Sequence, residues 1–194
     1  LRMADDLFGW LVKERMIGDN PANGIVPLRK KEAAETQRLP FNTAELEAIF
    51  NAPIYTGCMD DENGFAKPGT NIIRRSRYWV PLLALYSGMR MGEILQLTPG
   101  HIRRSANGTD YIVLTRDMVL KSNAAEREIP IHPELVRLGF LDWVEQNCND
   151  SGELLFADVP PGKHGYRSDT FTKRFATALR KIDIAPARKS KLSF

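Results

Sequence analysis

The chain has 194 residues, of which 43% are apolar and 26% charged, and its formal net charge is +3. This composition suits one core-forming domain with an appendage, and no apolar run reaches the roughly 18 residues that span a bilayer. The two cysteines, Cys58 and Cys148, lie far apart in the sequence, which argues against a disulfide framework. We therefore expect a cytoplasmic chain without membrane contact.

The first third of the chain predicts two helices joined by a polar linker. Apolar residues at helical spacing indicate a helix over 3–17, which the run Gly18-Asp19-Asn20-Pro21 ends. Residues 24–40 have the composition of a linker. A capping-box pattern at Asn42 then begins a helix that continues to Phe50. The Gly-, Pro- and acid-rich stretch 52–71 indicates a long exposed loop.

The most informative segment surrounds Arg90. Residues 79–86 are almost wholly apolar and predict a helix that stops at Gly88, so that Arg90 stands at the start of the next helix. Free N–H groups at a helix start attract an anion, and a guanidinium can bind two phosphate oxygens at once. Glu93 is placed to cap that turn and to hold Arg90. The alternative is an ordinary helical corner with a solvated arginine.

The following residues predict a β-hairpin that carries a lysine. Residues 111–115 are β-rich, and a polar loop then leads into a short strand that ends at Ile131. Lys121 would project from this hairpin.

Helices dominate the last third of the chain. A helix is expected over 132–148, a short strand over 153–156, and a last helix, capped by Ser168 and Asp169, to about Ile182. The predicted fold class is therefore α+β, mainly helical, with one small antiparallel sheet.

Charge is distributed unevenly along the chain. Residues 71–121 hold 8 Lys/Arg against 3 Asp/Glu (+5) and residues 160–194 hold 9 against 2 (+7), whereas residues 122–159 hold 2 against 8 (−6). Such segregation favours a face that binds nucleic acid, although solvated helix faces are the alternative. The candidate DNA-binding residues are Arg74, Arg75, Lys163, Arg167 and Lys173. No histidine has ligand companions at metal-site spacing, so no metal or other cofactor is expected.

Two segments together resemble the tyrosine recombinase (phage integrase) family. They are Ser-Gly-Met-Arg-Met-Gly-Glu-Ile-Leu, which begins at Ser87, and Lys-Ser-x4-Arg-x-Ile-Pro-Ile, which begins at Lys121. The resemblance implies an integrase-like catalytic domain in which Arg90 binds the scissile phosphate of double-stranded DNA. Lys121 would protonate the leaving 5′ oxygen, and Glu93 would support Arg90. It also implies a 3′-phosphotyrosyl intermediate, a homotetramer on DNA and a bacterial, nucleoid-associated protein.

The family's remaining catalytic residues have no counterpart in the chain. They are a His-x-x-Arg box, a later His or Trp and the Tyr nucleophile, all of which the resemblance places C-terminal to the segment that ends at Phe194. The resemblance therefore predicts an inactive internal piece of a longer enzyme. Its parts would be the end of an N-terminal core-binding domain (1–23), a linker (24–40) and the first part of the catalytic domain (41–194). A non-catalytic DNA-binding relative and a type IB topoisomerase-like enzyme remain as alternatives.

Overall fold

The protein is described by a computed structural model over residues 2–25, 40–116, 118, 126–147 and 152–184. It divides into two compact units, residues 1–37 (unit 1) and 38–194 (unit 2). Most of the expected linker 24–40 lies outside the described residues, and so does Lys121.

Unit 1 contains one helix, α1 (Arg2–Lys13), among its described residues. The helix ends four residues earlier than predicted, because Arg15 takes a left-handed conformation with φ 58°. Asn20 returns to the helix and donates from Nδ2 to the Asp5 carboxylate at 2.8 Å. Leu7 and Trp10 are both about half exposed, so the apolar stripe of α1 is only partly covered.

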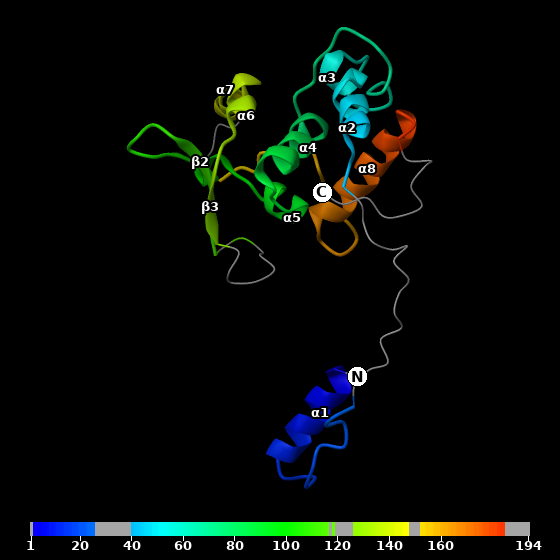
Figure 1. Ribbon diagram of the computed structural model, residues 1–194, viewed down its shortest axis with the longest axis vertical. Helices are drawn as coiled ribbons and strands as arrows, with labels where there is room; N and C mark the ends of the chain where they lie inside the picture. The colour runs from blue at the N-terminus through cyan, green and yellow to red at the C-terminus, as the bar shows by residue number, and fades with distance from the viewer. Residues whose placement is uncertain (1, 26–39, 117, 119–125, 148–151, 185–194) are drawn as a thin grey trace. The chain divides into compact units, whose positions relative to one another are not determined.

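Unit 2 combines helices with a small antiparallel sheet (Figure 1). Its first helix, α2 (Thr43–Phe50), begins as predicted: Asn42 accepts from the Glu45 N–H at 2.9 Å, and Glu45 accepts from the Asn42 N–H at 2.8 Å. A single turn, α3 (Pro53–Thr56), follows. The predicted α+β character is thus observed.

The apolar helix α4 (Ser76–Ser87) lies at the centre of unit 2 and leads into the candidate site. It begins three residues earlier than predicted, and Pro81 lies inside the helix. Gly88 ends the helix with φ 64°, a left-handed conformation that glycine adopts without strain. Arg90 is then the N-cap residue of α5 (Met91–Ile94).

The sheet has the order β1-β2-β3, with all pairs antiparallel. The strands β2 (Asp110–Leu114) and β3 (Arg127–Pro130) form the predicted hairpin. The third strand, β1 (Ile102–Arg104), was not expected, because a three-residue edge strand is too short for its alternation to stand out in the sequence. Ile112 pairs with Ile102 on one side and with Ile129 on the other, which fixes the register.

Two expectations about residues 132–156 were wrong. The expected helix over 132–148 is broken into α6 (Pro133–Arg137) and α7 (Phe140–Asn147), because Gly139 between them has φ 81°. Residues 153–156 form turns instead of a strand. They are apolar because Leu155 and Phe156 fill the core, and a short apolar run does not distinguish the two cases.

The last helix, α8 (Arg167–Lys181), lies beside α5. It begins before the predicted cap: Tyr166 is the N-cap residue, and Ser168 and Asp169 lie inside the first turn. Among the described residues, no helix has both the length and the apolar character that a membrane crossing needs.

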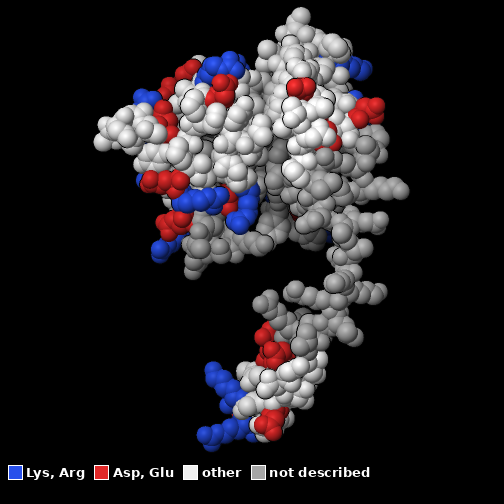
Figure 2. All heavy atoms as spheres, viewed as in Figure 1, with Lys and Arg blue, Asp and Glu red and all other residues white. Residues whose placement is uncertain are grey.

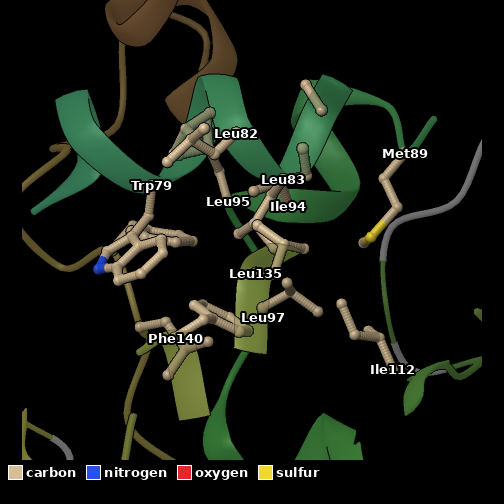
Figure 3. Packing of buried hydrophobic residues seen from close by; sticks show 14 of the residues in the cluster. Trp79, Leu82, Leu83, Met89, Ile94, Leu95, Leu97, Ile112, Leu135 and Phe140 are labelled. Carbon is tan, nitrogen blue, oxygen red and sulfur yellow. The ribbon is translucent and has the colours of Figure 1, made fainter. Parts of the chain in front are cut away.

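The main core gathers around α4 (Figure 3). Leu83 and Trp79 of α4 are fully buried, and they share one cluster with Ile94 of α5, Leu95 directly after that helix, Leu135 of α6 and Phe140 of α7. Ile112 closes the same core from the sheet. The α4–α5 turn is therefore attached on one side to the helices and on the other to the hairpin.

The stretch 52–71 is folded more tightly than an exposed loop. Cys58 is 2% exposed, and it exchanges backbone hydrogen bonds with Asn71 at 2.8 and 3.1 Å. Phe65 is also buried, and the cationic groups of Arg77 and Lys181 lie over its ring. The expectation of an exposed loop was therefore wrong. The glycine and acid content of this stretch is typical of exposed loops, although the stretch packs against the rest of unit 2.

Gly69→Ala should destabilise unit 2 by about 2 to 3 kcal/mol. A Cβ atom at Gly69 would lie 2.4 Å from the carbonyl of Cys58 and 2.6 Å from the Met59 nitrogen, and both are backbone atoms that cannot turn aside. The unfolding midpoint in urea measures the effect. Gly92→Ala is the matched control, because nothing lies within 4 Å of its Cβ position. Equal midpoints for the two variants would contradict the prediction.

Candidate functional site

Arg90 lies where the sequence predicted it, but at the start of a very short helix. The helix α5 has four residues, so few peptide dipoles add up behind its N-terminus. The Arg90 N–H is also occupied, because it donates to the Glu93 carboxylate at 2.9 Å. Anion binding at this turn would therefore depend on the Arg90 side chain, which is 58% exposed.

Glu93 joins Arg90 to the hairpin. Its side chain is 4% exposed, and its carboxylate accepts from Arg90 Nη1 at 3.1 Å. The same carboxylate accepts from Nη2 of Arg127, in β3, at 2.9 Å and from its Nη1 at 3.4 Å. The predicted contact of Glu93 with Arg90 is thus confirmed, and a second arginine joins it from the sheet.

The two arginines explain how a buried carboxylate stays ionised. Burial alone would raise the pKa of Glu93, but hydrogen bonds and charge from Arg127 and hydrogen bonds from Arg90 outweigh it and hold the pKa below its ordinary value. The ionised carboxylate therefore stabilises the fold at pH values above the ordinary pKa of a glutamate. This contribution is lost as the pH falls through the lowered pKa.

No role was predicted for Arg127, although the motif that begins at Lys121 contains this residue. A signal was present: Arg127 and Ile129 are the two half-buried residues of β3, and Glu128 and Pro130 between them are exposed. An arginine on the inward face of a short strand needs a partner for its charge. That partner is Glu93, 34 residues earlier in the chain.

Lys121 belongs by sequence to the connection between β2 and β3, but it lies outside the described residues. The predicted convergence of Lys121 and Arg90 on one cleft therefore stays a prediction. The hairpin that carries the connection is confirmed, and the Arg127–Glu93 pair ties its second strand to the Arg90 turn.

Two DNA-binding candidates lie just before α4. Arg74 and Arg75 are both exposed. The Arg74 guanidinium lies 5.8 Å from the centre of the Tyr78 ring, and Arg75 is 4.0 Å from the Asp61 carboxylate. Asp61 is held more closely by Arg77, at 2.9 Å. Both candidates therefore keep exposed charge available to a polyanion.

The other three DNA-binding candidates differ from one another. Lys163 and Lys173 are exposed, the first before α8 and the second within it. Arg167 is half-buried and donates from Nη1 to the carbonyl of Val159. Part of its donor capacity thus stabilises the turn before α8.

The helix α8 also touches the Arg90 turn. Thr172 donates from its hydroxyl to the sulfur of Met91 at 3.6 Å, and Met91 directly follows Arg90. Lys173 is the next residue of the same helix. On the face of unit 2 in Figure 2, by contrast, basic side chains alternate with acidic ones. Arg104 pairs with Asp110 at 2.7 Å, and Arg137 pairs with Glu134 at 2.7 Å. Local ion pairs therefore neutralise part of the charge that the sequence segregates into basic and acidic segments.

Several tyrosines have structural roles. Tyr55 donates its hydroxyl to the Tyr78 carbonyl at 3.3 Å, and burial raises the pKa of its phenol. Tyr78 is buried against Trp79, and Tyr86 stacks on His132 with ring centres 4.6 Å apart. A buried phenol with a raised pKa is a poor nucleophile.

Comparison with known proteins adds no relative: no protein-family model matches the chain, and no curated protein matches it.

Proposed function

We propose that this chain supplies part of the active site of a DNA strand-transfer enzyme of the tyrosine recombinase type. The observation that carries the proposal is the Glu93 carboxylate, which binds Arg90 and Arg127 together and so attaches the Arg90 turn to the hairpin strand that follows Lys121. In this proposal Arg90 binds the scissile phosphate of double-stranded DNA. Lys121 protonates the departing 5′ oxygen.

The residue types suit this chemistry. Transesterification at a phosphodiester increases negative charge on the non-bridging oxygens, which a preorganised guanidinium stabilises. Arginine stays charged throughout, whereas a lysine can give up a proton if its surroundings lower its pKa. Arg90 commits Nη1 to Glu93, and a guanidinium has five N–H donors, so further donors can reach a phosphate.

The nucleophile of the proposed reaction is assigned to a longer, full-length enzyme. The sequence His-x-x-Arg occurs at His101 and at His164, but Arg104 pairs with Asp110 and Arg167 donates to the Val159 carbonyl. Neither sequence is therefore assigned as the family's box, and no tyrosine of this chain is assigned as the nucleophile. In the full-length enzyme a tyrosine would form a 3′-phosphotyrosyl link, strands would be exchanged within a homotetramer, and the link would conserve the energy of the broken phosphodiester. The 194-residue chain should then bind DNA without forming a covalent adduct.

Binding of labelled duplex DNA to the 194-residue chain should be weak, indifferent to sequence and strongly salt-dependent. Each phosphate neutralised by Lys or Arg contributes about −0.9 to the slope of log K against log[salt]. Lys173→Gln should therefore make the slope less negative by about 0.9 if Lys173 contacts a phosphate. Fluorescence anisotropy titrations at salt concentrations from about 50 to about 200 mM measure the slope for the unmodified chain and for Lys173→Gln.

Lys67→Gln is the matched control, because Lys67 is also exposed but lies in the acid-containing segment before α4. Its slope should equal that of the unmodified chain. Binding that ignores salt would show that the basic segments are only a solvated surface. A complex that survives denaturant would show that a tyrosine of this chain is the nucleophile.

A further inference from the structure

Arg127 binds the Glu93 carboxylate with both terminal nitrogens of its guanidinium. Nη2 lies 2.9 Å from Oε2 and Nη1 lies 3.4 Å from Oε1, so the planar fork faces the planar carboxylate. Such two-point contact restricts rotation of the carboxylate more than one hydrogen bond does. The side chain of Glu93 is thereby held from the sheet as well as from its own turn.

The orientation of the carboxylate determines where the Arg90 side chain lies. Oε2 accepts from the Arg90 backbone N–H at 2.9 Å, while Oε1 accepts from Arg90 Nη1 at 3.1 Å. Arg90 is otherwise 58% exposed, and a long exposed side chain samples many rotamers. The contact with Oε1 selects among them, and Arg127 keeps Oε1 in place.

We infer that Arg127 is a positioning residue that acts through Glu93 to hold Arg90 ready for a phosphate. The inference rests on the proposed function for its consequence in catalysis, but its structural part concerns only these three side chains. In this assignment Arg127 acts on Glu93, to which both of its terminal nitrogens donate.

The first test uses the 194-residue chain without DNA. Arg127→Met keeps a long apolar stem and removes the fork. The pKa of Glu93, followed by its carboxyl carbon signal in NMR, should rise, because Arg127 is a principal group that lowers it. The Nε–H signal of Arg90 should lose its restricted mobility. Arg104→Met is the matched control, since Arg104 of the same sheet also makes a two-point contact. Its Nε donates to Asp110 Oδ1 at 2.7 Å and its Nη2 donates to Oδ2 at 2.9 Å.

The second test uses the full-length enzyme and separates positioning from stability. Arg127→Met should lower the rate of strand cleavage about tenfold, the scale of a misplaced catalytic group, with the DNA dissociation constant unchanged within about twofold. In a Glu93→Gln background the same substitution should have little further effect, since the path from Arg127 to Arg90 is already interrupted. Arg104→Met should cleave at the unmodified rate.

The two tests fail in different ways. The positioning role would be overturned if Arg127→Met and Glu93→Gln had multiplicative effects on the cleavage rate and the NMR signal of Arg90 were unchanged. That result would leave the recombinase proposal standing. Failure of the unmodified full-length enzyme to cleave DNA would overturn the recombinase proposal. The NMR measurement would still decide whether Arg127 orders Arg90: a mobile Arg90 in Arg127→Met supports the inference, and an unchanged one refutes it.

Discussion

If the proposed recombinase function holds, Arg90→Ala in the full-length enzyme should lower strand cleavage by roughly 10²-fold or more, the scale of losing one preorganised donor to a developing oxyanion. DNA affinity should remain nearly unchanged, because many basic residues share the phosphate contacts and Arg90 is only one of them. The rate of formation of the denaturant-resistant protein–DNA link measures cleavage, and a filter-binding titration measures affinity. A parallel fall in both would remove Arg90 from the transition state.

Arg137→Ala is a close control for this experiment. Arg137 forms an i,i+3 ion pair with Glu134 at 2.7 Å, as Arg90 does with Glu93, and the two arginines are similarly exposed. Glu134, however, is itself partly exposed and has no link to the hairpin in the described structure. The control variant loses the same charge and the same local pair, so it should cleave normally.

Arg90→Lys distinguishes geometry from charge. Lysine keeps the positive charge but replaces the planar fork by a compact ammonium group, which cannot bind Glu93 and two phosphate oxygens in the same way. We expect this variant to recover only part of the lost rate. Full recovery would mean that Arg90 acts as a point charge, and the orienting contact with Glu93 would then have no catalytic purpose.

Local signals explain which parts of the site could be predicted. The Gly88 stop, the start at Arg90 and the contact of Glu93 with Arg90 each depend on residues within one or two turns of one another, and the structure confirms all three. Rules for helix ends are rules about such short spacings. The contact between Arg127 and Glu93 spans 34 residues, and no spacing rule predicts it.

The failed fold predictions have a common cause. Residues 153–156 have the composition of a strand, but Leu155 donates its N–H to the Leu97 carbonyl at 2.8 Å within a buried turn. The glycines in 52–71 suggested an open loop, yet Gly57 and Gly69 permit two backbone segments to approach closely. In both cases the tertiary environment, and not local composition, decides the conformation.

Trp79→Ala should cost unit 2 about 3 to 5 kcal/mol of unfolding free energy, the range for removing a large aromatic side chain from a packed core. The Trp79 side chain is fully buried, and the rings of Tyr78, Phe140 and Trp143 surround it with centres 4.9, 5.1 and 5.7 Å away. These three rings are held by two helices, so they cannot all move into the space that the indole leaves. Trp10→Ala is the matched control, since Trp10 is 52% exposed in unit 1, and its effect should stay within about 0.5 kcal/mol.

Trp79→Phe should cost less than its loss of volume suggests. The indole Nε1 of Trp79 is buried and meets no acceptor in the described part of the chain. A buried donor without a partner costs about 1 to 3 kcal/mol, and phenylalanine removes that donor together with part of the ring. The gain offsets part of the cavity cost, so urea unfolding should place Trp79→Phe well above Trp79→Ala in stability. Equal losses for the two variants would contradict the prediction.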